Sequence, residues 1–430
     1  MNIAAIVTSL ALVFMGFAGG GGSSSGGGGG GGSSYSGGSS YSSSSSSSGS
    51  SSSDDPAAVI IFIVIFIIVM ALISKSGKAG RAYKDFNSTA QEKNIHTATE
   101  HIFKSYQEDW SEFRPDDIKT FTTDHYYEHA SLMLELLKNL HRTNKVGKLK
   151  VKKVYLLDPV NEKTPLPANL RVAFAFSGLD EVITDDGQKL YSQFVSSATE
   201  VWNFVYDGTN LKLSGIAQPT ESAPHLVKSL ASFADQNNLF YSPDWGRYAL
   251  PARGLIFGGA SMKIADINNH VIGKWGLKSA NASAEQTSAT PVDSGILIQL
   301  YTYAPTPNQS TSSYYIVGQI NVPKDYLGVI VKSRKFKSGV RPDKSYENYE
   351  MEWGEFNGRY EVYAASRDAL PAFELLNPKF MEFLYNKNPS YSLEVVDNVI
   401  YIYASIKNIT EKDYEDMLEV LQKAYDELKM

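Results

Sequence analysis

Hydrophobic positions follow three different patterns along the chain, and each pattern predicts a different kind of element. The first is an unbroken apolar run without a charge, AAVIIFIVIFIIVMALI, from Ala57 to Ile73. At about 1.5 Å per residue a helix of this run is about 26 Å long, the short end of a bilayer span. Because only a helix pairs the backbone of such a segment in lipid, we predict a transmembrane helix over residues 56–74.

The charges on the two sides of this run are unequal. Asp54 and Asp55 precede it, whereas the basic connector that follows, residues 75–85, carries Lys75, Lys78, Arg81 and Lys84. An excess of Lys and Arg marks the cytoplasmic side of a span. We therefore expect a single-pass protein of the cell membrane with its C-terminal part in the cytoplasm. The same four basic residues are candidates for contact with lipid headgroups.

Two further segments precede the predicted span. Met1–Ala18 is apolar and lacks Lys and Arg, and it ends in small residues, so it is either a cleaved signal peptide or a short span of its own. From Gly19 to Ser53 the chain holds 14 Gly and 19 Ser. Such a tract, residues 19–55, buries too little apolar surface to offset the entropy of ordering, so we expect it to be disordered outside the cell.

The second pattern, apolar residues at steps of three and four, predicts two helices after the connector. Pro115 stops the first helix, and Asp116 and Asp117 cap a short turn. Thr123 or Asp124 caps the second helix, and Gly147 ends it. The predicted buried positions are Ile95, Ala98, Ile102, Phe103, Tyr106 and Trp110 in the first helix and Tyr126, Ala130, Met133, Leu134, Leu137 and Leu140 in the second.

The third pattern is a period of two, which predicts strands over 149–157, 170–176, 192–204 and 210–216. The turns between them fall at Asp185–Gly187 and Asp207–Gly208. Helices followed by a meander of long antiparallel strands predict an α+β domain, residues 86–221, whose curled sheet wraps the helices as a cone with a pocket. Glu200, Trp202 and Phe204 share one face of a strand and either line that pocket or pack on Phe103 and Leu137.

A linker helix, residues 222–242, leads to a second α+β domain, residues 243–430. Its predicted helices cover Pro378–Tyr385 and a final segment that Thr410 opens. Its predicted strands are 255–257, 261–267, 296–303, 314–320, 328–331, 359–364, 391–396 and 399–406.

Composition removes several classes of function. The chain of 430 residues has no cysteine, which excludes thiolate catalysis and Cys-ligated metals, and its net charge of -6 argues against nucleic-acid binding. His125, Glu128 and His129 match the H-x-x-E-H pattern of inverted zinc peptidases, but they lie on an ordinary amphipathic helix. We therefore expect no metal, no cofactor and no catalytic residue.

Two polar clusters have both a structural and a functional interpretation. The stretch from Lys138 to Lys153 holds seven basic residues and no acidic one, which suits a solvated edge or a patch for anionic headgroups. Asp266, Asn269 and His270 form a polar turn beside a strand, or an acid–base pair in which Asp266 orients His270.

Two sequence segments resemble known families. The segment Glu200-Val-Trp202-Asn-Phe204, with Leu211-Lys-Leu213-Ser-Gly215-Ile216-Ala-Gln218, is similar to the last strands of the Tim-forty-four-like domain, named for the membrane tether of the mitochondrial import motor. Tyr206 stands where that family usually has a basic residue. The C-terminal part resembles a bacterial domain family without an assigned activity, through Leu250–Gly254, Asp266–His270, Glu355–Val362 and Leu376–Met381.

The resemblance implies a nuclear-transport-factor-two-like cone in residues 86–221 and a non-catalytic tether or scaffold. Such a protein binds a protein partner or a lipid through this domain. The alternative is a small-ligand-binding or enzymatic pocket in the same cone, since one fold hosts both kinds of function.

Overall fold

The computed structural model describes residues 84–85, 89–158, 160, 163–217, 228–244, 266–275, 295–304, 314–335, 342 and 344–428. Residues 85–430 cluster as one compact unit. The predicted signal peptide, Gly/Ser tract and span lie outside the described residues, as does the connector apart from the backbone of its last two residues. Among the helices that are described, none has both the length and the apolar character needed to cross a membrane.

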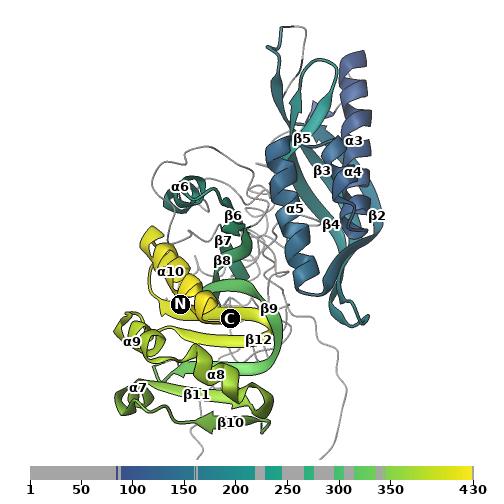
Figure 1. Cartoon of the computed structure of the whole chain (residues 1–430). Coiled ribbons are helices and arrows are strands. Elements are labelled where there is room, and N and C mark those ends of the chain that lie inside the picture. Colours follow the sequence, from purple (N-terminus) through teal and green to yellow (C-terminus); the bar gives the residue numbers. More distant parts are fainter. Residues whose placement is uncertain are drawn as a thin grey trace, which may run out of the picture. The chain divides into compact units, whose positions relative to one another are not determined.

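A five-stranded sheet forms the first half of the described chain (Figure 1). Its strands lie in chain order: β1 (Lys84–Asp85), β2 (Arg142–Leu156), β3 (Ala168–Thr184), β4 (Lys189–Tyr206) and β5 (Leu211–Ala217). From β2 onward each strand pairs antiparallel with the next. The two predicted turns are confirmed, with Gly187 and Gly208 at positive φ angles of 87° and 102° that suit glycine.

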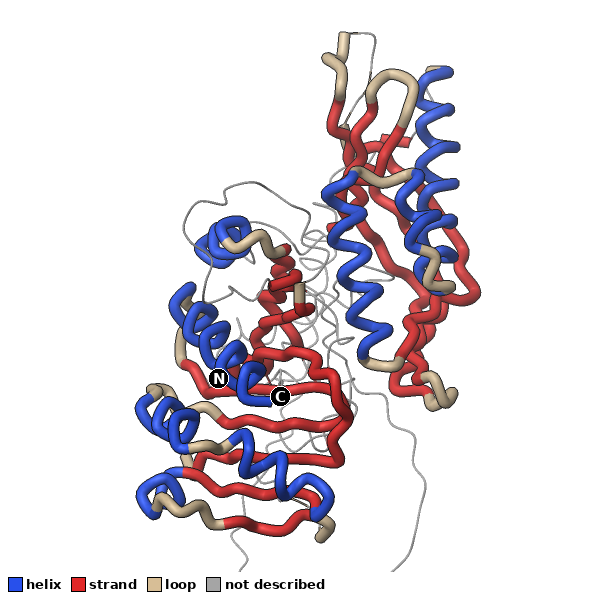
Figure 2. Tube along the Cα trace, viewed as in Figure 1, coloured by secondary structure: helices blue, strands red, loops and turns tan. Residues whose placement is uncertain are grey.

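Three helices precede β2: α3 (Ala90–Ser111), α4 (Pro115–Thr120) and α5 (Asp124–Asn139). Both α3 and α5 contact β2 and β5 (Figure 2). Thr89 and Glu92 form a capping box that starts α3. Thr123, rather than Asp124, is the N-cap of α5.

The predicted end of the second helix at Gly147 is wrong. α5 ends at Asn139, and β2 begins at Arg142, so Gly147 lies inside a strand. The reason is that the period of two already begins before the glycine: Arg142 and Asn144 are buried, and the residues between and after them are more exposed. Gly147 instead precedes a register shift between β2 and β3.

A seven-stranded antiparallel sheet forms the second half. The strands are β6 (Phe240–Asp244), β7 (Asp266–Trp275), β8 (Ile296–Ala304), β9 (Tyr314–Ser333), β10 (Tyr346–Tyr349), β11 (Tyr360–Ala365) and β12 (Ser392–Ile406). Their order is β10-β11-β9-β8-β7-β6, and β12 also pairs with β9. The 20-residue β9 is therefore flanked by β8 and β12 at its start and by β11 and β12 at its end.

Three predictions for the second half need correction. The strands predicted at 314–320 and 328–331 are one strand, β9, and those at 391–396 and 399–406 are one strand, β12, which bulges at Asp397. Asp266–His270 is part of β7 rather than a turn, because a bulge at Asn269, with φ of 54°, carries the strand through this polar stretch.

The helices of the second half cover one face of the larger sheet. They are α6 (Lys228–Gln236), α7 (Gly354–Arg359), α8 (Ala369–Leu375), α9 (Pro378–Asn386) and α10 (Glu411–Leu428). The closest approach is between α10 and β9: a Cβ added at Gly318 would lie 2.6 Å from Leu421 Cδ1 and 2.7 Å from Met417 Sδ. The molecule is thus an α+β protein with two curled antiparallel sheets, as the sequence predicted at this level.

Candidate functional site

The predicted pocket residues Glu200, Trp202 and Phe204 lie together on β4, and all three are fully buried. The indole Nε1 of Trp202 donates a hydrogen bond of 2.9 Å to Glu200 Oε2. This bond places the carboxylate beside the indole of its own strand, two residues away, so both polar groups are satisfied inside the fold.

Helix α3 fills the space that a pocket would need. The ring centroid of Trp202 lies 4.8 Å from that of Phe103 and 5.4 Å from that of Tyr106, and Phe174 lies 4.5 Å from Phe103. Burial raises the pKa of Tyr106, and the nearby Glu200 adds to the rise. This face of the first sheet is an aromatic core around one carboxylate, and it does not form an open pocket.

A second buried polar network crosses the same core, and the sequence analysis missed it. Trp110 Nε1 donates to Asn144 Oδ1 at 3.0 Å, and Asn144 Nδ2 donates to Asp180 Oδ1 at 2.6 Å. Beside it, Gln107 is 1% exposed, and its amide has no hydrogen-bond partner among the described residues. The one available signal was Asn144 in a strand that otherwise alternates lysines with apolar residues.

The two histidines of the zinc-like motif on α5 both pack against Phe240 rather than around a metal site. His125 and Glu128 are exposed, whereas the His129 ring stacks on Phe240 with a centroid distance of 5.0 Å and an interplanar angle of 2°. Burial, together with the smaller effect of the nearby His125, lowers the pKa of His129 to about 4. No group of three or more potential ligands that could hold a metal ion occurs in the described part of the chain.

The outer face of the first sheet is basic. Lys145, Lys148, Lys150, Lys152 and Lys153 are all exposed on β2. Lys152 Nζ reaches across to the backbone oxygen of Ser196 on β4. Two residues earlier on β4, on the same face, Phe194 is 56% exposed. We call these five lysines and Phe194 the lysine face.

The second sheet holds a buried polar row on the face opposite α10. Gln299 pairs across the sheet with Gln319, and Gln319 with Tyr401. His270 Nε2 lies 3.1 Å from Gln299 Oε1, and burial lowers the pKa of His270 to about 3. The Gln319 amide, 1% exposed, has no hydrogen-bond partner within the described segments.

This polar row faces a buried cation of the first half. Arg142 is 2% exposed, and its Nε donates to the Leu140 carbonyl oxygen. Burial lowers the pKa of Arg142, and the nearby Tyr401 and Tyr301 partly oppose that change. His270, predicted as a possible base, thus lies in a tightly packed interior. The side chain of Asp266, its predicted partner, lies outside what the structure describes.

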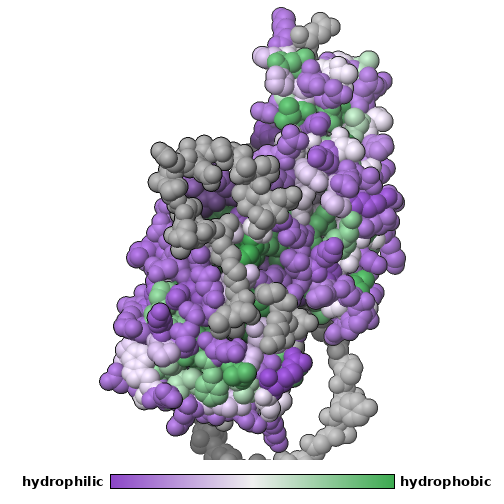
Figure 3. All heavy atoms as spheres, viewed as in Figure 1, coloured by the Kyte–Doolittle hydropathy of each residue, from purple (hydrophilic) through white to green (hydrophobic). Residues whose placement is uncertain are grey.

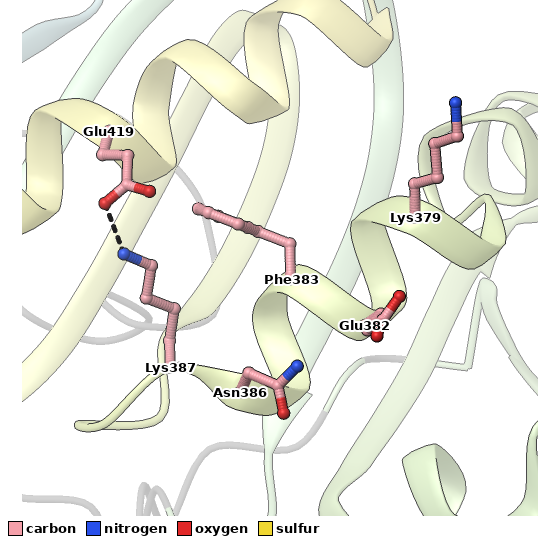
Figure 4. A pocket seen from close by; sticks show the side chains of 6 residues that line it. All are labelled: Lys379, Glu382, Phe383, Asn386, Lys387 and Glu419. Carbon is pink, nitrogen blue, oxygen red and sulfur yellow. Dashed lines mark hydrogen bonds and ion pairs between the residues drawn. The ribbon is translucent and has the colours of Figure 1, made fainter.

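An open depression of about 420 Å³ lies between α9 and α10 (Figure 4). Its walls are Lys379, Glu382, Phe383, Asn386, Lys387 and Glu419. Lys387 forms an ion pair with Glu419, and its Nζ also lies 4.9 Å from the Phe383 ring centroid. Within the depression Lys387 is thus held by Glu419 and Phe383.

Of the predicted lipid contacts, Lys75, Lys78 and Arg81 lie outside the described residues, and only the backbone of Lys84, in β1, is described. The site that the structure brings together is instead the lysine face, which the run from Lys138 to Lys153 had indicated in part. Phe194 gave no signal, because a strand period alone does not tell which of two faces is covered.

Comparisons with known proteins found little similarity. No family model matches the chain, and no curated protein matches it. A solved structure, that of the mycobacterial trehalose monomycolate transport factor A, TtfA, shares 11% sequence identity at a TM-score of 0.33. That match covers 47% of this chain and 93% of the other.

Proposed function

We propose that this protein is a non-catalytic tether anchored in the cell membrane by residues 56–74, with both α+β halves in the cytoplasm. In this proposal the first half is a Tim-forty-four-like, nuclear-transport-factor-two-like cone that binds a lipid or a protein partner. The Gly/Ser tract lies outside the cell, and Lys75, Lys78, Arg81 and Lys84 contact headgroups next to the anchor.

The observation that carries the proposal is the lysine face. Five exposed lysines lie along β2, and Phe194, which is 56% exposed, lies on the same face of the sheet two strands away on β4. Each Lys or Arg near an anionic membrane contributes about 1 kcal/mol of attraction. The binding surface is therefore the outer face of the first sheet, because the inner face is filled by Phe103, Tyr106 and Trp202.

The pocket alternative is disfavoured by the same packing. A ligand on the inner face of β4 would have to displace the α3 rings that lie within van der Waals reach of Trp202. The Glu200 carboxylate already accepts the Trp202 indole hydrogen bond.

The absence of cysteine allows a direct test, because one introduced thiol can be labelled uniquely. Ser196→Cys, spin-labelled in the full chain, should gain protection from aqueous relaxation agents in nanodiscs that contain phosphatidylglycerol. It should remain exposed in nanodiscs of phosphatidylcholine alone. Lys150→Glu with Lys152→Glu should abolish the difference, and a label at Lys407→Cys should show none. A Ser196→Cys label that is equally exposed in both nanodiscs would exclude the lipid and leave an acidic protein surface as the partner.

A further inference from the structure

Three of the five large apolar side chains that are exposed in the described structure gather at one corner of the second sheet. Leu327 is 43% exposed, Leu370 67% and Phe373 46%. Leu327 lies at the bend of β9, and the other two lie on α8. Figure 3 shows apolar surface where α8 and β10 lie. We call Leu327, Tyr349, Leu370 and Phe373 the apolar corner.

Several contacts hold this corner together. The Tyr349 and Phe373 rings meet edge to face with centroids 5.6 Å apart, and Tyr346 Oη donates to the Leu327 carbonyl at 3.3 Å. The backbone N–H of Gly328, the residue after Leu327, donates to Asp368 Oδ2 at 2.8 Å, which ties β9 to the start of α8. These contacts hold the backbone that carries the apolar side chains in place, although the outer surfaces of those side chains face solvent.

The corner adjoins the edge of the sheet. β10 is the terminal strand of the sheet order, paired only with β11 among the described strands. Its outer backbone N–H and C=O groups form a template on which another extended chain can pair. Glu347 and Tyr349 point to the α8 side, because Glu347 accepts hydrogen bonds from Tyr349 Oη at 2.9 Å and from Ser366 Oγ at 3.0 Å.

The charge around the corner selects the occupant. Glu347, Glu350, Glu352 and Glu374 are exposed. Among the described residues that flank β10 and α8, the cations are Lys344 and Arg367, and Arg367 already lies 3.5 Å from Asp368. An anionic membrane is repelled by such a surface. A second copy placed on the same corner by twofold symmetry would bring the same carboxylates together.

We propose that the β10 edge binds an extended segment of a protein partner in which basic and apolar residues alternate. The segment adds a strand beside β10. An apolar side chain opposite Tyr349 contacts Phe373 and Leu370, and a Lys or Arg two residues away meets Glu347. This site lies in the second half and is independent of the lysine face.

The test uses a labelled peptide, acetyl-Thr-Lys-Thr-Phe-Thr-Lys-Thr-amide, and the full chain in mild detergent, with fluorescence polarisation as the readout. Its alternating pattern reads the same in both directions, so it fits either strand orientation. Phe373→Ser and Leu370→Ser should each weaken binding by about tenfold or more, because both side chains are exposed and their loss leaves the fold intact. The matched control is Leu166→Ser, at a residue that is 53% exposed and lies outside both proposed surfaces, and it should leave the affinity unchanged.

Charge and backbone are tested separately. Glu347→Lys with Glu374→Lys should reverse the preference, so that the peptide with Glu in place of Lys binds better. Methylation of the peptide backbone nitrogens should abolish binding, because it removes the donors for strand pairing.

Three results would overturn the proposal. The first is no saturable binding by the Lys peptide. The second is binding that Leu166→Ser reduces as much as Phe373→Ser does. The third is tighter binding by a peptide of residues 75–84 of this chain, which would make the occupant the protein's own connector. Failure of this test leaves the proposal for the lysine face unaffected, because the two surfaces share no residue. Lys150→Glu with Lys152→Glu should accordingly not change the affinity for the Lys peptide.

Discussion

The two sheets of this protein bury their helix-covered faces in different ways. Under α3 the first sheet buries indole, phenol and carboxylate groups, and these groups bond to one another: Trp202 with Glu200, Trp110 with Asn144, and Asn144 with Asp180. Under α10 the second sheet buries aliphatic side chains around Gly318. Its buried polar row, with Gln299 and Gln319, lies on the opposite face.

The difference indicates what fixes each half in a unique packing. A buried polar network is specific, because each unsatisfied partner costs the full desolvation of its group. An aliphatic layer is specific through shape, because overpacking forces atoms apart. The first half should therefore respond most to the loss of a hydrogen-bonding ring, and the second to added volume.

The largest effect should come from Trp202→Ala. Truncation of a fully buried aromatic costs about 3–5 kcal/mol, and it leaves Glu200 without its indole donor. Near-ultraviolet circular dichroism of the full chain in urea should show the first half unfolding early. Phe194→Ala, at an exposed aromatic of the same strand, is the control. An unchanged midpoint of urea unfolding for Trp202→Ala would contradict the placement of Trp202 in the core.

The next largest effect should come from Gly318→Val, which should lower the free energy of unfolding by about 1–3 kcal/mol. The new Cβ falls within 3 Å of Leu421 and Met417, so α10 must move away from β9. Gly358→Ala has open space around its Cβ and should be nearly neutral. Chemical unfolding measures both variants, and equal loss in the two would show that α10 does not pack closely.

A pH titration should separate His129 from the exposed histidines. Its pKa is lowered from 6.5 to about 4, so the unfolded chain binds the proton first as the pH falls. Stability is therefore full above pH ~6.5 and declines toward pH ~4, by on the order of 1–2 kcal/mol at pH ~5. His129→Phe keeps the ring stack on Phe240 and should remove about half of this decline, because His270, whose pKa burial lowers to about 3, contributes a similar share. His101→Phe should not change it, and a profile that His129→Phe leaves unaltered would mean that this ring titrates normally.

The smallest effects should come from the two helix caps. Thr89 caps α3, and Thr410 accepts the Asp413 N–H at the start of α10. Thr89→Ala and Thr410→Ala should each cost about 1 kcal/mol, seen as a small shift of the melting temperature. Thr97→Ala, inside α3, should cost less, and a loss there equal to that of Thr89→Ala would argue against the capping box.

Much of the first half could be predicted from the sequence, because its elements are long and each has one clear period. α3, α5 and the two turns at Gly187 and Gly208 follow from patterning and turn chemistry. The end of α5 did not, because Gly147 is a signal for a helix end and for a strand bulge alike. Both domain halves were predicted as α+β, and this much the structure confirms.

The second half and the site were harder to predict for a physical reason. β9 and β12 each contain a polar or irregular stretch, which a local sequence pattern indicates as the end of a strand. Both strands continue through this stretch because they pair with strands that are distant in the sequence. The lysine face was visible as a run of charge, but Phe194 became part of it through cross-strand register. The apolar corner joins residues from β9, β10 and α8, which no local window contains.

The position of β9 has a consequence for how the chain is made. The first sheet pairs successive strands, so it can form as the ribosome releases it. β9 pairs along most of its length with β12, which is made only after β10, β11 and the helices between them, so Tyr314 waits for Ile406. Pairing at such sequence separation is slow and leaves hydrophobic edges open in the meantime. During synthesis the nascent second half is therefore the part that chaperones should hold until β12 has emerged.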